Sequence, residues 1–214
     1  LDESIAADGF RVRERPDGDR RGATIDLAAI DFETLAKRFA KAQRKNVELE
    51  RLRAAVRAQL ERLIRVNRTR ADYQQKFEEL IESYNVGSRN IDELFKELIA
   101  LSRTLSDEEQ RHVREHLTEE ELTVFDLLTR PGPELTTQER AEVKKVARQL
   151  LTRVRGALVL GWRQKQQARA QVKIAIEDTL DEGLPRAYTP DVYKTKCAVI
   201  FEHVFETFGE AASV

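Results

Sequence analysis

The histidines and the single cysteine are the side chains of this sequence best suited to metal or acid–base chemistry. His112, Glu115 and His116 form the pattern H-x-x-E-H, the order found in one class of zinc peptidases. On a helix the two imidazoles would share a face, but a catalytic zinc also needs a third protein ligand and a dry pocket. This short, highly charged segment indicates instead an exposed helix whose histidines only titrate. Cys197 and His203 have no further ligands nearby in the sequence, which favours a packing role for both.

The most distinctive polar stretch is the run that begins at Trp162. It contains Arg163, Lys165, Gln166 and Arg169, all of which carry long hydrogen-bond donors, and it contains no acid. Such a set would recruit carboxylates or phosphates, so these five residues are our candidate contact site for a partner. The alternative is a solvated helix face, with Trp162 acting as a core anchor. No phosphate-binding G-x-x-x-x-G-K-[ST] or G-x-G-x-x-G motif is present, and neither is G-x-S-x-G.

The elements that must position this stretch are predicted to be helices. Apolar residues at helical spacing run from Glu139 to Leu158, with a joint allowed at Gly156, and the range 158–185 is predicted to be one long helix ended by Gly183 and Pro185. A last helix is expected to begin at Thr189, with proline in its first turn.

Composition sets the fold class. With 41% hydrophobic and 35% charged residues, nine glycines and five prolines, the 214-residue chain is typical of an all-α protein with solvated charged faces. One cysteine fits a reducing compartment, and no apolar run approaches the length that spans a bilayer. We therefore expect a cytoplasmic protein without membrane contact. Because methionine is absent, we also expect this chain to be part of a longer one.

The chain is predicted to form a multi-helix bundle with long amphipathic helices. Residues 1–30 are assigned to a leading segment or linker with an irregular or hairpin-like structure, and 31–214 to a helical domain. Within that domain we expect a long arm over about 31–84, broken near Asn67 with a capping-box-like restart at Thr69, and a bundle over about 90–208. The expected starts of the bundle's helices are Asn90, Ser106, Thr118 and Thr136.

Charge alternates in blocks along the sequence. Lys and Arg prevail over 35–70 and 140–173, whereas Asp and Glu prevail over 72–126 and from 174 onward. The blocks either neutralise each other across helix contacts or provide a basic surface for nucleic acid. Neither basic block contains interleaved aromatic residues or a recognition motif, so sequence-specific readout is unsupported.

Two stretches carry a resemblance to a known family. The first is EELTVFDLLTRPGPELTTQERAEVKKVARQLL. The second covers residues 158–206 and contains the elements W-R-x-K-Q-x-x-R-A, from Trp162, and Y-T-P-x-x-Y-x-x-K-C, from Tyr188. Before both comes YNVGSRNIDELFKELI, which resembles the preceding part of the same region. Over roughly 70–208 the sequence resembles the C-terminal helical region of the R subunit of type I restriction enzymes. The family's large subunit also carries a nuclease domain and two ATP-driven helicase domains, whose motifs are not found here.

The resemblance implies a part of a DNA-translocating and cleaving enzyme that does not itself perform the chemistry. It implies a helical domain that joins the motor to the methyltransferase and specificity subunits, with DNA bound through the parent complex. No catalytic residue, metal ligand or cofactor is then expected in this segment, and ATP and Mg²⁺ would belong to the parent enzyme. Two alternatives stay open: a basic helical surface that contacts DNA near the motor, and an intramolecular brace for the helicase domains.

Overall fold

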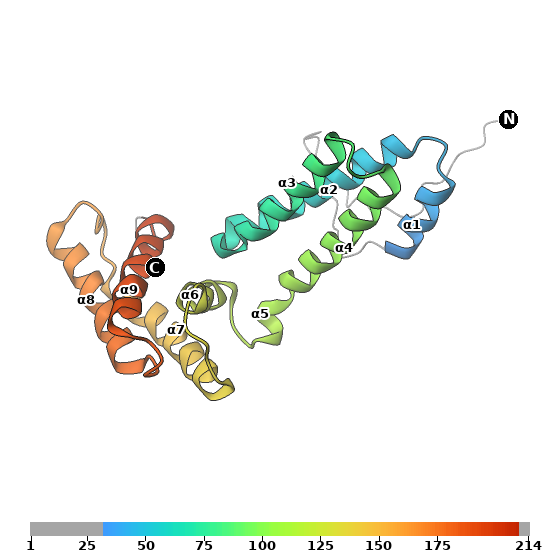
Figure 1. Ribbon diagram of the computed structural model, residues 1–214. Helices are drawn as coiled ribbons and strands as arrows, with labels where there is room; N and C mark the ends of the chain where they lie inside the picture. Colours follow the sequence, from blue (N-terminus) through green and yellow to red (C-terminus); the bar gives the residue numbers. More distant parts are fainter. Residues whose placement is uncertain (1–31, 210–214) are drawn as a thin grey trace. The chain divides into compact units, whose positions relative to one another are not determined.

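The computed structural model describes residues 32–209 (Figure 1). All regular secondary structure in this range is helical, which confirms the predicted all-α class. The contacts group the chain into two compact units, one ending at Arg111 and the other beginning at His112. The predicted leading segment 1–30, with its hairpin, lies outside the described residues.

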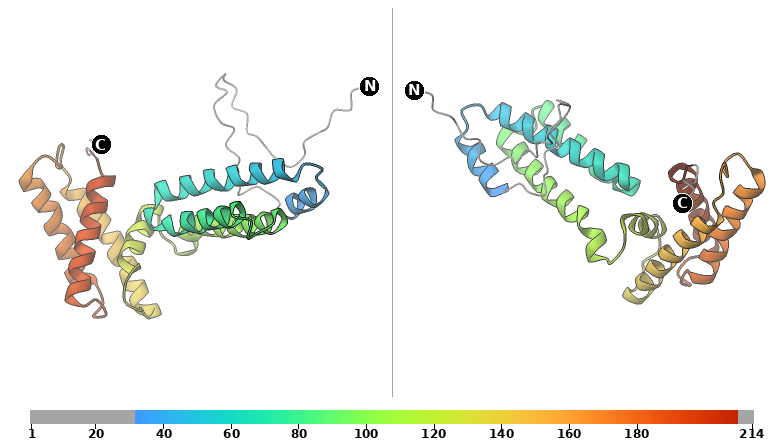
Figure 2. Two further views of the ribbon diagram at one scale, coloured as in Figure 1. Left: turned by 45° about the horizontal axis from the view of Figure 1, so that its top comes forward. Right: turned by 180° about the vertical axis from the view of Figure 1, so that it is seen from behind.

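The described residues of the first unit, 32–111, contain four longer α-helices and a short 3₁₀ turn. They are α1 (Phe32–Lys41), α2 (Lys45–Val66), η2 (Arg68–Arg70), α3 (Ala71–Asn85) and α4 (Ile91–Glu109). Helices α2, α3 and α4 run side by side (Figure 2). Their core is a set of buried apolar side chains at helical spacing, which includes Leu52, Val56, Leu60, Phe77, Leu94, Leu98 and Leu105. The ring of Phe39 on α1 stacks on Phe95 of α4, so α1 joins the same core.

The predicted helical arm over 31–84 is interrupted twice. Helix α1 ends at Lys41, a break that the apolar periodicity did not indicate. The break expected near Asn67 is confirmed, but its cap is different from the predicted one. The buried Asn67 side chain accepts hydrogen bonds from both the backbone N–H and the hydroxyl of Thr69, and no side chain caps α3. Asn67 therefore lies between α2 and η2 and caps η2, because its short side-chain amide can accept from the backbone N–H of the residue two positions later.

Ion pairs join basic α2 and the turn after it to acidic α4. Lys45 pairs with Asp92 (2.6 Å), and Arg62 pairs with Glu109 (2.7 Å). The pair formed by Arg70 and Glu108 is the buried one, with Nε and Oε1 3.0 Å apart and side chains only 2% and 7% exposed. Part of the charge alternation in this unit is therefore neutralised across a helix interface.

Arg70 and Glu108 lead to a stability prediction for the first unit. Removing Arg70 leaves the buried carboxylate of Glu108 with only Arg111, whose Nε lies 2.9 Å from Oε1 of Glu108, and the loss of one of its two cations costs about 2 kcal/mol. Arg70→Met should lower the free energy of unfolding by about that amount, measured by urea denaturation followed by circular dichroism.

Arg51→Met is the matched control. Arg51 forms an exposed ion pair with Glu48 within α2, so this substitution should change the free energy of unfolding by less than about 0.5 kcal/mol. Equal effects of the two substitutions would contradict a structural role for the buried pair.

In the described residues 112–209, the second unit is a bundle of four longer helices, α6 (Glu119–Thr129), α7 (Thr137–Ala157), α8 (Gln166–Gly183) and α9 (Pro190–Thr207). The short α5 (Arg111–Arg114) precedes them in the sequence. Helix α6 packs on α7 and α9, and α8 packs on the same two helices, so the four close around one core (Figure 1). Buried Leu122, Leu150, Ile176 and Ile200 bring one side chain from each helix into that core.

In the described residues, most helices begin at the capping residues predicted from the sequence. Asn90, Thr118 and Thr136 each form a capping box with the Glu three residues later, and Thr189 accepts from the N–H of Val192. These starts are confirmed. The start predicted at Ser106 is wrong, because Ser106 lies within α4, where its hydroxyl donates to the carbonyl of Ser102.

Basic α7 and the acidic segment before and within α6 repeat the charge arrangement of the first unit. Lys144 pairs with Glu115 (2.6 Å), and Arg155 pairs with Glu120. These pairs join the basic block 140–173 to the acidic block 72–126. Arg153 of α7 also pairs with Glu182 of α8 (2.7 Å), which joins the same basic block to the acidic block from 174 onward.

Candidate interaction surface

The predicted single helix over 158–185 is wrong at its start. Helix α7 ends at Ala157, and residues 158–165 form a loop before α8 begins at Gln166. Gly161 in this loop has a φ of +67°, a left-handed conformation that is strained for other residues. The predicted end at Gly183 is confirmed. A Cβ at Gly183 would lie 2.6 Å from Cγ2 of Val146, so glycine also permits the close packing of α8 on α7.

Trp162 is the anchor of the loop. Its side chain is fully buried, and its Nε1–H donates to the carbonyl oxygens of Phe208 (3.1 Å) and Gly209 (3.2 Å) just beyond α9. Its ring meets those of Phe201 and Phe205 edge to face, with centroids 6.5 and 5.6 Å away. The core-anchor interpretation of Trp162 is confirmed, and the loop is held to the end of α9.

The next two candidate residues also make contacts within the unit. Arg163 donates to the carbonyl of Glu206 (3.0 Å) and lies over the ring of Phe205, with 5.3 Å from Cζ to the centroid. Lys165 donates from Nζ to the carbonyl of Leu160 (3.0 Å), which closes the loop on itself. Both cations therefore satisfy backbone carbonyls at a helix end or a turn, where positive charge is favourable.

Gln166 and Arg169 are exposed on α8 and line a groove between α8 and α9. Ala170 and Lys173 continue the α8 wall of this groove, and Phe201, Glu202 and Phe205 form its α9 side. Of the five candidate residues, two thus line the groove, and Trp162, Arg163 and Lys165 hold the loop before it, although Lys165 is itself exposed. Sequence reasoning missed the aromatic side of the groove. Its only signal is the i, i+4 spacing of Phe201 and Phe205, which equally suits a core stripe.

Trp162 leads to a prediction about the loop. Trp162→Phe keeps an aromatic ring but removes the donor to both carbonyls, and it should lower the free energy of unfolding by about 1–2 kcal/mol. Trp162→Ala also removes the ring packing and should cost about 3–5 kcal/mol. Urea denaturation followed by circular dichroism measures both effects.

Leu160→Ala in the same loop is the control, because Leu160 is 62% exposed and should contribute less than about 0.5 kcal/mol. A Trp162→Ala variant as stable as Leu160→Ala would show that the loop is not anchored in this way.

The Y-T-P-x-x-Y-x-x-K-C element holds α9 to its neighbours. The Tyr188 hydroxyl donates to the carbonyl of Leu128 (3.2 Å), and the Tyr193 hydroxyl donates to the carbonyl of Glu177 (2.9 Å). Buried Lys196 donates from Nζ to the carbonyls of Leu127 and Pro131 at the end of α6. A lysine at a helix C-terminus interacts favourably with the helix dipole. The tyrosines and the lysine of this element therefore have structural roles.

Tyr188 makes the stability of this unit sensitive to alkaline pH. Burial raises the pKa of the Tyr188 hydroxyl from 10.0 to about 12. The folded state therefore holds this proton more tightly than the unfolded state, and the associated stability is complete below pH 10 and is lost as the pH rises toward 12. Tyr188→Phe should unfold with a weaker pH dependence in that window than the parent chain, as measured by urea denaturation at each pH. Identical slopes would contradict this assignment.

The H-x-x-E-H residues do not share a helix face. Helix α5 ends at Arg114, and His116 has a φ of +55°. Nδ1 of His112 lies 3.1 Å from Oε1 of Glu119, and Glu115 pairs with Lys144. The predicted exposed helix is thus wrong in its extent, and Glu115 serves an ion pair to α7. Within residues 32–209, no group of three or more His, Cys, Asp or Glu side chains is placed to hold a metal ion.

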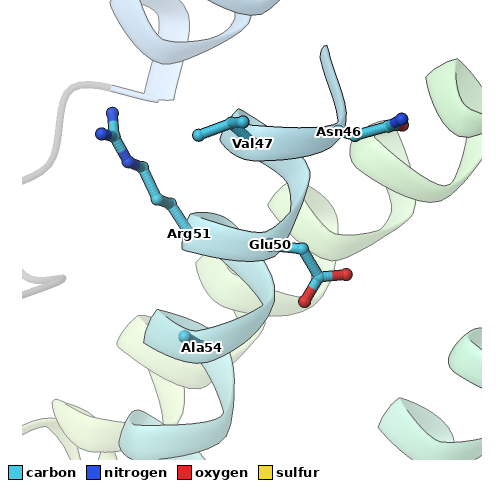
Figure 3. A pocket seen from close by; sticks show the side chains of 5 residues that line it. All are labelled: Asn46, Val47, Glu50, Arg51 and Ala54. Atoms are coloured by element: carbon cyan, nitrogen blue, oxygen red, sulfur yellow. The ribbon is translucent and has the colours of Figure 1, made fainter. Parts of the chain in front are cut away.

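A second hollow lies on the outer face of α2 in the first unit (Figure 3). Its lining residues are Asn46, Val47, Glu50, Arg51 and Ala54. Val47 and Ala54 give it an apolar surface, while the side chains of Glu50 and Arg51 extend in different directions in Figure 3. Both charges are engaged on α2 itself, because Glu50 pairs with Arg53 and Arg51 with Glu48. The hollow therefore offers no charge pattern that selects a ligand.

The fold defines an all-α bundle domain, and the sequence places it in a known family. Residues 21–210 match the family described as type I restriction enzyme HindI endonuclease subunit-like, C-terminal. The chain belongs to this family, so it is a C-terminal domain of the endonuclease, or R, subunit of a type I restriction enzyme. The expected resemblance is confirmed over a longer stretch than the one recognised from the motifs. No curated protein and no solved structure matches the chain. Among the described helices, none is long and apolar enough to cross a membrane.

Proposed function

We propose that this domain joins the ATP-dependent motor of its R subunit to the methyltransferase and specificity subunits. The exposed edge of α8 carries the proposal. Gln166 and Arg169 lie there on a helix whose preceding loop is fixed by buried Trp162, so the backbone that carries them is held in place. Within the described part of the chain, Arg169 makes no ion pair or side-chain hydrogen bond, and its guanidinium is available to a partner's carboxylate.

Family membership supports the proposal because it places the chain in a multisubunit enzyme. In this proposal ATP and Mg²⁺ bind to the parent subunit's motor and nuclease domains, and the complex acts in the cytoplasm. The domain itself positions the motor and takes no part in the chemistry.

The alternative of a DNA-binding track is less well supported by the charge distribution. A track needs a row of cations that are free to meet phosphates. Arg62, Arg70, Lys144 and Arg155 instead pair with acids of other elements, as described above. Arg57 and Arg140 lie over the rings of Phe77 and Phe125. Many of the basic side chains are thus engaged inside the two units. A brace for the helicase domains is the third possibility, and binding experiments separate it from the other two.

Sedimentation of the R subunit with its methyltransferase and specificity subunits tests the proposal. We expect a stable complex at moderate salt, weakened about tenfold or more by Arg169→Glu combined with Lys173→Glu. The control is Lys145→Glu combined with Lys194→Glu, which makes the same change of charge at exposed positions on α7 and α9 outside the groove.

Three outcomes separate the alternatives. Selective weakening by the α8 pair supports joining. If an R subunit that lacks this domain forms the complex as well as the wild type does, the joining role is contradicted and the brace is favoured. DNA binding by the domain that falls steeply with salt, without subunit binding, favours the track.

A further inference from the structure

An open groove lies between α8 and α9 and is lined by side chains of both helices. Its volume is about 520 Å³, within the range of protein binding clefts. The small side chain of Ala170 lies among the longer Gln166, Arg169 and Lys173 on α8, which leaves a hollow between that wall and α9. Two adjacent helices with a depression between them can receive the apolar face of a third helix.

The aromatic floor of the groove is held in place from below. Phe201 and Phe205 are only partly buried, so each leaves ring surface exposed to solvent. Their inner sides pack edge to face on fully buried Trp162, with interplanar angles of 86° and 80°. Arg163 adds a cation–π contact to Phe205. The floor is therefore preorganised, and covering it would remove apolar surface from water without ordering loose side chains.

Charge differs between the two walls. On α8, Arg169 and Lys173 are cationic, and Lys173 has only a long, exposed approach to Glu177 (3.7 Å). On α9, the charged wall residue is Glu202. A partner that fits this pattern presents apolar side chains in the middle and carboxylates along the edge that faces α8. A single-stranded nucleic acid would stack bases on the two rings, but its phosphates would meet the carboxylate of Glu202 as well as the two cations, so a protein segment with mixed apolar and acidic side chains fits better.

We infer that the α8–α9 groove, lined by Arg169, Lys173, Phe201 and Phe205, is the docking site for an amphipathic helix of the methyltransferase or specificity subunit. That helix carries an apolar stripe with Asp or Glu along one edge. The inference rests on the proposed joining function and specifies the chemistry of the partner.

A steric block of the groove tests the inference in the full-length R subunit. Ala170→Trp fills the hollow from an exposed position, and the matched control Ala141→Trp adds the same ring at an exposed site on α7. The affinity for the methyltransferase–specificity complex is measured by titration. We expect the dissociation constant to rise at least tenfold for Ala170→Trp and less than about twofold for Ala141→Trp.

Failure of the inference is distinguishable from failure of the proposed function. If the complex requires this domain but Ala170→Trp does not weaken it, the groove is not the docking site and the joining role is kept. No domain-dependent complex in the wild type would overturn both.

A photo-crosslinking amino acid at position 170 identifies the occupant. Crosslinks to a helix of the methyltransferase or specificity subunit with acids flanking an apolar stripe would support the inference. Crosslinks to the R subunit's own motor domains, to DNA, or to nothing would each overturn it.

Discussion

The interaction on which the candidate surface depends is the burial of Trp162. Its indole N–H and its ring both reach the end of α9, so one side chain holds a loop, a helix end and two further aromatic rings. The loop it fixes leads directly into α8, and the rings it supports form the floor of the groove beside that helix. A side chain with no exposure thereby determines the geometry of side chains that are open to partners, as second-layer packing does in many binding sites.

A second constraint is the pairing of oppositely charged segments. In each unit a basic helix lies against an acidic element, and several of the pairs join residues distant in the sequence. Exposed pairs of this kind contribute little stability individually, but like charges placed at the same contacts would be repelled. Block charge in this chain therefore favours one arrangement of helices within each unit. Part of the charge of the basic stretches is thereby neutralised inside each unit, in a chain whose net charge is −1.

Much of the fold could be predicted because its signals are local. Capping residues such as Thr118 and Thr136 act within one helical turn, and their spacing to Glu121 and Glu139 is visible in the sequence. The loop at 158–165 could not be predicted from periodicity, because Leu158 and Trp162 keep helical spacing although the backbone leaves the helix at Leu158. Gly161 was the available signal. The groove could not be predicted either, since it exists only once α8 and α9 pack side by side and leave Ala170 beside Phe201 and Phe205.

Hydrogen–deuterium exchange of the full-length R subunit, with and without the methyltransferase–specificity complex, tests the central claim most directly. The claim is that α8 and α9 present the contact surface of this domain. The account predicts slower exchange on binding in residues 166–173 and 201–205, with little change in α2 or in the exposed face of α7. Protection confined to other parts of the domain, or no protection within 112–209, would contradict it.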